Sequence, residues 1–220
     1  HILGATISER AGRWFISLQV KTEITVQTNM GPVVGVDLGV RKLVTLSDGT
    51  FVSNPRPLGR YDRKLRRLHR AMARKKRGGK NYVDCRRKLS TTYLRMTNLR
   101  KDAVHKSTSK LARTKSVIGV EDLPVRNMLK NRVLAKCIQE AAFGEFVRQL
   151  EYKTAWYGST MVRISRVFPS TKMCSRCGRV KSSMGLGERS YECGSCGLMI
   201  DRDLNAAINQ STPEAFTTDP

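Results

Sequence analysis

Two acidic residues stand in this sequence where carboxylates could bind divalent metal ions. Asp37 interrupts the apolar run VVGVDLGV, and Glu121 ends a second apolar run in SVIGVEDL. Such runs predict buried strands, where an isolated carboxylate destabilises the fold unless it is paired or metal-bound. Two strand-end carboxylates in one sheet would also raise each other's pKa, and Mg²⁺ or Mn²⁺ would remove that penalty. The pattern indicates metal-dependent phosphodiester chemistry; the alternative for Asp37 is a strand-end residue that accepts backbone N–H bonds.

A third carboxylate lies at the start of the last predicted helix, in DRDLNAAIN, and the spacing leaves its identity open. Asp201 and Asp203 are two residues apart, so an extended approach places both on one face. Aspartate is a good N-cap, which is the alternative role for whichever of the two binds no metal. The small side chains of Ala206 and Ala207 would let this helix pack close to the sheet and bring its first turn to the other carboxylates.

Four of the six cysteines form a C-x2-C-x15-C-x2-C pattern, made up of Cys174, Cys177, Cys193 and Cys196. This spacing is typical of a tetrahedral Cys₄ zinc site. Two disulfides are the alternative, but paired CxxC motifs are typical of metal binding in a reducing compartment. Cys85 and Cys137 lie in helical patterns and are predicted to be buried or half-buried free thiols. We therefore expect one structural zinc ion.

The chain is strongly basic and has the composition of a globular protein. Its 220 residues carry a formal net charge of +23, with 41 Lys and Arg against 18 Asp and Glu, and 40% of them are apolar. So large a charge destabilises a compact protein by self-repulsion unless a polyanion relieves it. Basic surfaces of this density are typical of nucleic-acid binding. The sequence has no run of about 18 apolar residues, so we expect no membrane-spanning segment.

Most of this charge is concentrated in residues 58–115. From Arg60 to Lys115 the sequence has 21 Lys and Arg and three Asp. Apolar residues at three- and four-residue steps predict two long helices, which Gly78-Gly79 separates. A merely solvated helix face would mix both signs, so we interpret this one-sided surface as a phosphate track. The residues that we expect to contact nucleic acid are Arg66, Arg67, Arg70, Arg74, Lys75, Lys76, Arg77, Arg86 and Arg87.

The remaining elements predict an α/β domain with a mixed sheet. Residues 2–9 and 13–22 are expected to form a hairpin, which is marginal alone, so the chain is expected to start inside a domain. Buried strands are expected over VVGVDLGV, SVIGVEDL and STMVRISR, with a hairpin turn at Ser47-Asp48-Gly49. Residues 133–157 predict one amphipathic helix that ends at Gly158.

In their order along the chain, five motifs resemble the carboxy-terminal half of TnpB, the OrfB-type protein family of bacterial and archaeal insertion sequences. They are GVDLGVRKLVTLSDG, VIGVEDL, PSTKMCSRCG, YECGSCG and DRDLNAAIN. The resemblance covers residues 31–210. It implies an RNase H-like (RuvC) mixed sheet with a long basic helical hairpin and a Cys₄ zinc ribbon as insertions. The implied domains are a partial wedge segment (1–30), a RuvC-like nuclease domain (31–171) with the helical insertion (58–115), a zinc ribbon (172–197), a final RuvC segment (198–212) and a flexible tail (213–220).

The same resemblance implies a DNA endonuclease that is RNA-guided in its complete form and encoded by a transposable element. Asp37, Glu121 and Asp203 match the family's catalytic positions and would hold two Mg²⁺ or Mn²⁺ ions, with Asp201 as the second choice for the third position. The implied partners are a DNA target and a guide RNA from the same element. The implied location is the prokaryotic cytoplasm, in association with the nucleoid and not with a membrane. The alternative functions are a non-cleaving nucleic-acid-binding regulator or an inactive fragment.

Overall fold

The computed structural model describes residues 1–185 and 187–217. Two compact units form within it. The first unit contains residues 1–25 and 55–103, and the second contains residues 26–54 and 104–220. The polypeptide therefore passes from one unit to the other inside its longest helix. Within the described parts of the chain, no helix is both long enough and apolar enough to cross a membrane.

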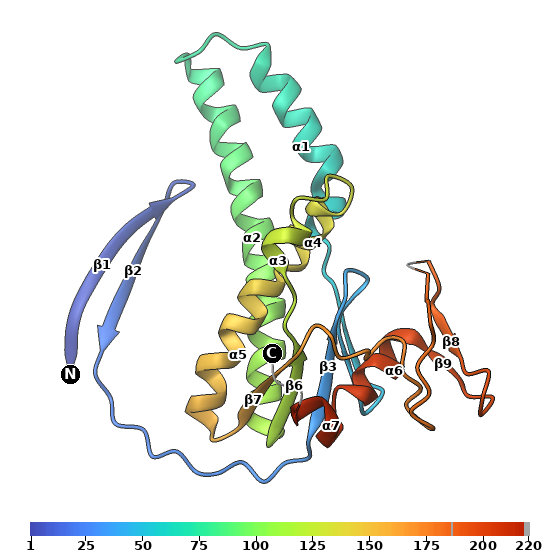
Figure 1. The fold of residues 1–220 in the computed structure, drawn as a ribbon. Helices are drawn as coiled ribbons and strands as arrows, with labels where there is room; N and C mark the ends of the chain where they lie inside the picture. The colour runs from blue at the N-terminus through green and yellow to red at the C-terminus, as the bar shows by residue number, and fades with distance from the viewer. Residues whose placement is uncertain (186, 218–220) are drawn as a thin grey trace. The chain divides into compact units, whose positions relative to one another are not determined.

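The first unit consists of a β-hairpin and two long helices (Figure 1). Strands β1 (Ile2–Arg10) and β2 (Arg13–Val20) pair antiparallel, and their apolar side chains are exposed, with Trp14 72% exposed. Helices α1 (Pro57–Ala73) and α2 (Lys80–Thr114) flank Gly78, whose φ of 78° ends the helical path as the sequence predicts. The two helices pack through a cluster of buried residues, Leu65, Leu68, Cys85, Leu89 and Met96.

A five-stranded mixed sheet forms the centre of the second unit, in the order β5-β4-β3-β6-β7. Its strands are β3 (Val34–Leu38), β4 (Lys42–Leu46), β5 (Phe51–Ser53), β6 (Val117–Glu121) and β7 (Thr160–Ile164). Strands β3, β4 and β5 pair antiparallel, whereas β6 is parallel to both β3 and β7. The predicted α/β class with a mixed sheet is confirmed. The hairpin turn expected at Ser47-Asp48-Gly49 joins β4 to β5.

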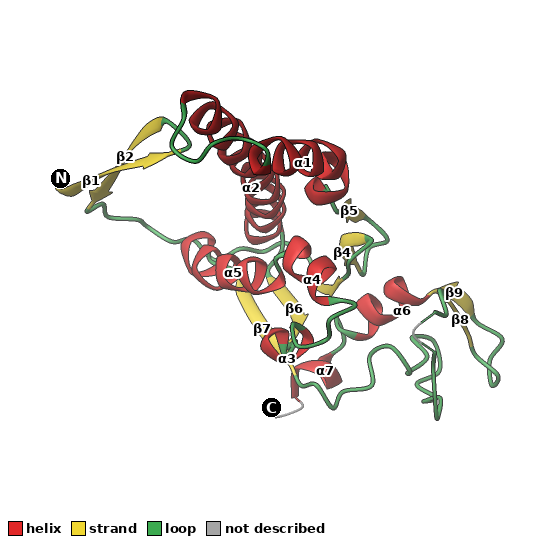
Figure 2. Cartoon of the chain, turned by 90° about the horizontal axis from the view of Figure 1, so that it is seen from above, coloured by secondary structure: helices red, strands yellow, loops and turns green. Residues whose placement is uncertain are grey.

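Helices cover both faces of this sheet. Figure 2 shows α5 (Phe143–Tyr157) on one side of β6 and β7, and α7 (Pro213–Thr217) on the other. Side chains alternate along a strand, so Val34 and Val36 of β3 point to one face, where they are fully buried. Gly35 and Asp37 point to the opposite face, which α6 (Arg202–Asn209) covers.

The structure corrects two of the predicted elements. The single helix expected over residues 133–157 is interrupted at Ala142, where φ is 55°, and forms α4 (Ala135–Ala141) and α5. The flexible tail predicted for 213–220 is helical over Pro213–Thr217, because Ala215 is fully buried there. Residues 218–220 of that predicted tail lie outside the described residues. The short helix α3 (Val125–Met128) follows β6.

Candidate metal centres and nucleic-acid surface

The two strand-end carboxylates lie at the same edge of the sheet. In the parallel pair β3–β6, Val36 is in register with Val120. Asp37 and Glu121 are the next residues of the two strands, so they lie side by side where both strands end. They also extend from the sheet face that carries Gly35 and Gly119. The sheet therefore brings together two carboxylates that are 84 positions apart in the sequence.

Glycines in the two central strands allow α6 to lie directly on the sheet. Gly35 and Gly119 are opposite each other in the register. A Cβ at Gly35 would lie 1.9 Å from the carbonyl oxygen of Ala207, and one at Gly119 would lie 2.2 Å from that of Gln210. Ala206 and Ala207 are almost fully buried in this contact, as their small size predicts. This close packing places the first turn of α6 beside the end of β3.

The two aspartates at the start of α6 have different roles. Asp201 is the N-cap. Its Oδ1 accepts hydrogen bonds from the backbone N–H groups of Asp203 (3.0 Å) and Leu204 (3.1 Å). Its Oδ2 accepts a hydrogen bond from Lys42 Nζ at 3.1 Å. Asp203 is the second residue of the helix, and its Oδ1 accepts a hydrogen bond from Arg202 Nη2 at 3.2 Å. Since the cap and the lysine already use both oxygens of Asp201, the geometry favours Asp203 as the third metal ligand.

The electrostatics of Asp37 reflect the closeness of the other carboxylates. Burial, followed by the charges of Asp203 and Glu121, raises its pKa to about 7. Burial also raises the pKa of Glu121, with Asp122 as the second cause. Carboxylates that disfavour one another's charge in this way are a suitable donor set for a hard divalent cation.

These carboxylates open into two neighbouring cavities. Asp37 and Asp203 line a cavity of about 380 Å³, and Glu121 lines another of about 270 Å³. The buried ring of Phe143 borders both of them. Among the described residues, the four cysteines form a group that could hold a metal ion with the side chains as they stand, whereas the three carboxylates do not.

Three arginines of the larger cavity were missed by the sequence analysis. Arg41, Arg189 and Arg202 line it together with Asp37 and Asp203. They come from the loop before β4, from the residue before β8 (Ser190–Glu192) and from the first position of α6. The sequence signal for Arg202 was its place between Asp201 and Asp203. The other two arginines come close to Asp37 only through the folding of the chain.

The four predicted zinc ligands lie together. Their sulfur atoms are all within 4.8 Å of one another, with Sγ–Sγ distances of 3.6 Å for Cys174–Cys196 and for Cys177–Cys193. A tetrahedral zinc with Zn–S bonds of about 2.3 Å separates its sulfurs by roughly 3.8 Å, whereas a disulfide bond is about 2.05 Å long. The geometry thus fits a metal and excludes two disulfides. The hairpin of β8 and β9 (Met199–Asp201) carries the second CxxC pair.

The protonation of the thiols also favours a bound cation. Backbone N–H groups of Cys196 and then Ser195 lower the pKa of Cys193 to about 6. The N–H of Leu198 acts in the same direction on Cys196, but burial and the three other thiols raise its pKa to about 12. One thiolate thus opposes the ionisation of the next, and a cation at the centre of the cluster would reverse this effect.

Two asparagines connect the cysteine cluster to the helix that carries Asp203. Asn205 donates to the carbonyl oxygen of Met173 at 2.7 Å and accepts from the N–H of Ser175 at 3.0 Å. Asn209, one turn later, donates to the carbonyl oxygens of Ser170 and Met173, both at 2.7 Å. Both asparagines are almost completely buried. The segment that leads into the first CxxC pair is therefore fixed to α6.

Replacing one cysteine tests the zinc centre. We expect Cys193→Ser to lose most of its zinc and to lower the thermal midpoint by on the order of 10 °C, because the metal stabilises the folded ribbon. Metal analysis of the purified chain and a thermal melt measure both effects. Cys137→Ser is the matched control, since Cys137 is an exposed free thiol outside the cluster. An unchanged zinc content in Cys193→Ser would contradict the Cys₄ assignment.

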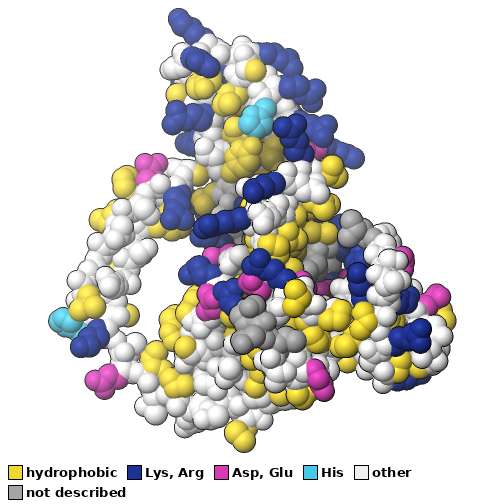
Figure 3. Space-filling model, viewed as in Figure 1, with side chains coloured by type: hydrophobic (Ala, Val, Ile, Leu, Met, Phe, Trp, Pro, Cys, Tyr) yellow, Lys and Arg dark blue, Asp and Glu magenta, His cyan; other side chains and the backbone are white. Residues whose placement is uncertain are grey.

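The predicted nucleic-acid contacts lie in the first unit, on α1, on α2 and in the loop between them. Arg66, Arg67 and Arg70 lie on α1, and Arg86 and Arg87 lie on α2. Arg74, Lys75, Lys76 and Arg77 follow the end of α1. All nine are exposed except Lys75, which is half-buried. Figure 3 shows Lys and Arg side chains concentrated over the helical hairpin. Two of the nine have acidic neighbours, in the pairs Arg66–Asp62 and Arg87–Asp84.

The two thiols outside the cluster differ in exposure. Cys85 is buried between α1 and α2, as the sequence predicts. Cys137 on α4 is exposed, which corrects the prediction of a buried or half-buried thiol. It lies on a seven-residue helix, in which only Ile138 and Ala141 are buried.

Two family models match the chain. The first, OrfB_IS605, is described as "Probable transposase" and matches residues 15–132, more than half of the chain. The second, described as "Cas12f1-like, TNB domain", matches residues 143–210. The first match includes Asp37 and Glu121, and the second includes the four cysteines and Asp203.

Several curated proteins are similar to the chain. A "Putative RNA-guided DNA endonuclease" of Streptomyces pristinaespiralis is 43% identical over 201 residues, which are 91% of this chain and 50% of that protein. "Putative RNA-guided DNA endonuclease InsQ" of Escherichia coli is 30% identical over 94% of this chain and 56% of that protein. "TnpB-like protein L79" of Acanthamoeba polyphaga mimivirus is 35% identical over 56% of this chain and 24% of that protein. The chain spans about half the length of the first two relatives.

Two solved structures have a similar fold. A Cas12f1 chain in a complex with sgRNA and target DNA aligns with a TM-score of 0.60 and 15% identity, over 94% of this chain and 55% of that chain. A CRISPR–Cas12f ternary complex aligns with a TM-score of 0.61 and 18% identity, over 92% and 43%. At these identities the likeness concerns the fold.

Proposed function

Because this chain belongs to the OrfB_IS605 family, we propose that it carries the DNA-cleaving chemistry of an RNA-guided endonuclease encoded by a transposable element. The observation that carries the proposal is the convergence of Asp37, Glu121 and Asp203. Two parallel strand ends and the first turn of α6 bring these residues together, and burial, followed by the charges of Asp203 and Glu121, raises the pKa of Asp37 to about 7. The name RNA-guided DNA endonuclease, which two of the relatives bear, supports the substrate class.

We assign the second unit to an RNase H-like (RuvC) nuclease fold. Three features support the assignment: the antiparallel β5-β4-β3 strands, the parallel β6 and β7 beyond them, and carboxylates at the adjacent ends of β3 and β6. The basic helical hairpin of α1 and α2 is then an insertion between β5 and β6. The β1–β2 hairpin corresponds in this proposal to part of the wedge domain.

In the proposed mechanism the three carboxylates hold two divalent cations, Mg²⁺ or Mn²⁺. Such a pair activates a water molecule and stabilises the leaving oxygen of a phosphodiester. Asp37 lies close to both Asp203 and Glu121, and together with them it would hold the cations. Arg202 holds Asp203 at 3.2 Å and so orients it. Arg41 and Arg189 line the same cavity, where their guanidinium groups would bind phosphate oxygens on either side of the scissile bond.

The rest of the chain would bind and support the nucleic acid. The basic side chains of α1, α2 and the loop between them would contact phosphates of the DNA target and of the guide RNA, without reading bases. The zinc ribbon, with one zinc ion on Cys174, Cys177, Cys193 and Cys196, would have a structural role. Asn205 and Asn209 connect it to α6, so loss of zinc would also displace Asp203. Association with the nucleoid follows from the proposed DNA substrate.

The function is tested by incubating the purified chain with end-labelled single-stranded DNA in the presence of Mg²⁺ or Mn²⁺. We expect cleavage that EDTA abolishes and that added Mn²⁺ restores. Binding is measured in parallel at several salt concentrations, and the affinity should fall steeply with salt. Salt-sensitive binding without metal-dependent cleavage, also in the presence of guide RNA, would instead favour a non-cleaving regulator.

A further inference from the structure

Asp122, the residue that follows Glu121, accepts hydrogen bonds from two arginines. Asp122 is the first residue after β6. Its Oδ1 accepts a hydrogen bond from Arg163 Nη1 at 3.0 Å. Its Oδ2 accepts one from Arg166 Nη2, and its carbonyl oxygen accepts one from Arg166 Nε at 2.7 Å. Both carboxylate oxygens and the backbone carbonyl of this residue are therefore fixed by guanidinium groups.

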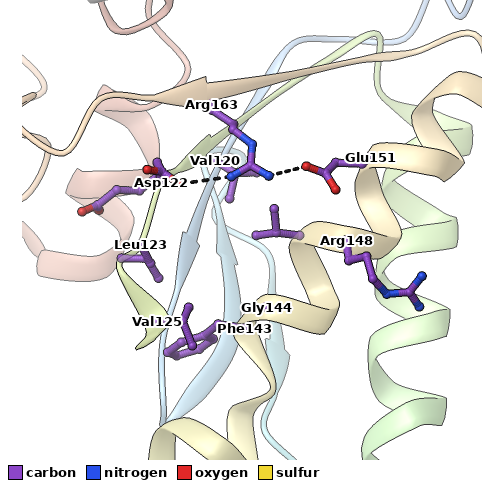
Figure 4. Close-up of a pocket in the computed structure, with 11 residues that line it drawn as sticks. Val120, Asp122, Leu123, Val125, Phe143, Gly144, Arg148, Glu151 and Arg163 are labelled. Carbon is purple, nitrogen blue, oxygen red and sulfur yellow. Dashed lines mark hydrogen bonds and ion pairs between the residues drawn. The ribbon is translucent and has the colours of Figure 1, made fainter. Parts of the chain in front are cut away.

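A fourth residue extends this arrangement to α5. Arg163 also donates through Nη2 to Oε1 of Glu151. Figure 4 shows Arg163 between Asp122 and Glu151, with a dashed line to each of them. We call Asp122, Arg163, Arg166 and Glu151 the Asp122 clamp. It connects the end of β6, strand β7, the loop that follows β7 and one face of α5.

The backbone at this point turns sharply, so the clamp acts where the strand direction is set. The N–H of Asp122 still donates to the carbonyl oxygen of Ile164 in β7 at 3.0 Å. One residue later the N–H of Leu123 donates to the carbonyl oxygen of Glu121 at 3.0 Å, which closes a tight turn. The direction in which the Glu121 side chain leaves the sheet depends on the position of this turn.

The exposure of the clamp indicates that its contribution is to position and not to global stability. The side chains of Asp122, Arg163 and Arg166 are 28%, 47% and 54% exposed. Ion pairs at such exposure contribute little to the free energy of unfolding. Two charge-assisted hydrogen bonds that hold both oxygens of one carboxylate do, however, restrict its geometry strongly. Arg166 also holds the backbone carbonyl of Asp122, so the clamp fixes the chain directly after Glu121 and, through it, the strand end that carries this candidate ligand.

We propose that Asp122, fixed by Arg163 and Arg166, is a positioning residue that orients Glu121 for binding a divalent cation. This inference rests on the proposed function, because it assumes that Glu121 is a metal ligand. Asp122 itself is not a ligand in this proposal, since the two arginines already engage both of its carboxylate oxygens. Without the clamp, Glu121 is still present, but the arginines no longer fix the end of β6 that carries it.

The test measures Mn²⁺ binding directly, so it does not depend on cleavage. Titration of the full chain with Mn²⁺, followed by electron paramagnetic resonance of the free ion, gives the dissociation constant. We expect Asp122→Ala and Arg166→Ala each to weaken binding by about 10-fold or more, as the loss of a residue that orients a metal ligand does. Their thermal midpoints should stay close to that of the wild type. The double variant should weaken binding by less than the product of the two single effects, because both changes remove the side-chain pair between Asp122 and Arg166.

Two reference variants separate the possible failures. Arg148→Ala removes another ion pair of α5, the one between Arg148 and Glu145. The Arg148 side chain points away from Asp122 (Figure 4). This variant should bind Mn²⁺ like the wild type. Glu121→Ala should weaken binding at least as much as Asp122→Ala. If Glu121→Ala has no effect, the proposed function itself is wrong. If Glu121→Ala weakens binding but Asp122→Ala and Arg166→Ala do not, only the positioning role is wrong.

Discussion

Asp37→Ala is expected to lower metal-dependent DNA cleavage by three or more orders of magnitude, equivalent to about 4 kcal/mol of activation free energy. Asp37 lies close to both Asp203 and Glu121, and in the proposed function it would hold the divalent cations together with them. The affinity for DNA should change by only a few fold, because in the proposed function the exposed basic side chains of the first unit would supply it. Single-turnover cleavage and a binding titration, carried out at the same salt concentration, measure the two effects separately.

The choice between Asp203 and Asp201 provides a matched control for this experiment. Asp203→Asn should be as inactive as Asp37→Ala, because it removes a charged ligand. Asp201→Asn should retain most of the activity, since asparagine caps a helix as well as aspartate does. The N–H groups of Asp203 and Leu204 would keep their acceptor in this variant. Full activity of Asp37→Ala would remove Asp37 from the site, and an inactive Asp201→Asn beside an active Asp203→Asn would exchange the roles of the two aspartates.

The sequence was sufficient to predict those parts of the site in which local pattern and chemistry coincide. The cysteine spacing predicts a metal cluster because four thiols have few other reasons to lie in two CxxC pairs. The apolar runs around Asp37 and Glu121 predict buried strands because most other positions in them are apolar. That both carboxylates end at one sheet edge follows from the parallel pairing of β3 and β6. The spacing alone left Asp201 and Asp203 open, the family resemblance favoured Asp203, and the hydrogen bonds at the start of α6 make Asp201 the N-cap.

Other features depend on contacts between distant residues and leave no local signal. Arg163 and Arg166 are about 40 positions from Asp122, and nothing in the sequence pairs them. The break at Ala142 has a φ of 55° without a glycine, so the pattern of residues 133–157 predicts a continuous helix. The tail was predicted to be flexible because it is polar, whereas the structure has a short helix there with Ala215 buried. In each case tertiary packing determines the local conformation.

The glycine pair under α6 has structural consequences as large as those of the cysteine cluster. Each strand that ends in a candidate catalytic carboxylate has a glycine two positions before it, namely Gly35 and Gly119. The two glycines are opposite each other in the register, and a Cβ at Gly35 or Gly119 would lie 1.9 Å or 2.2 Å from a backbone oxygen of α6 or of the residue after it. Any larger residue there would force the helix away from the sheet. The helix carries Asp203 at its first turn and Asn205 and Asn209 on its buried side, so the position of both candidate metal centres depends on this contact.

Gly35→Ala is therefore expected to destabilise the fold by on the order of 3 kcal/mol, because a Cβ would lie 1.9 Å from the Ala207 oxygen and 2.7 Å from the Ser211 nitrogen. Both atoms belong to the backbone, so α6 as a whole has to move. A displacement of about 1 Å at Asp203 would lower cleavage by roughly 100-fold. Chemical denaturation and cleavage below the unfolding transition measure the two effects.

Gly59→Ala is the matched control. Gly59 lies in α1, and a Cβ there would meet no atom within 4 Å. This variant should therefore keep wild-type cleavage and lose no stability. Wild-type stability of Gly35→Ala would show that α6 does not rest on β3 in solution. Reduced stability with full cleavage would show that the position of Asp203 is not critical for the reaction.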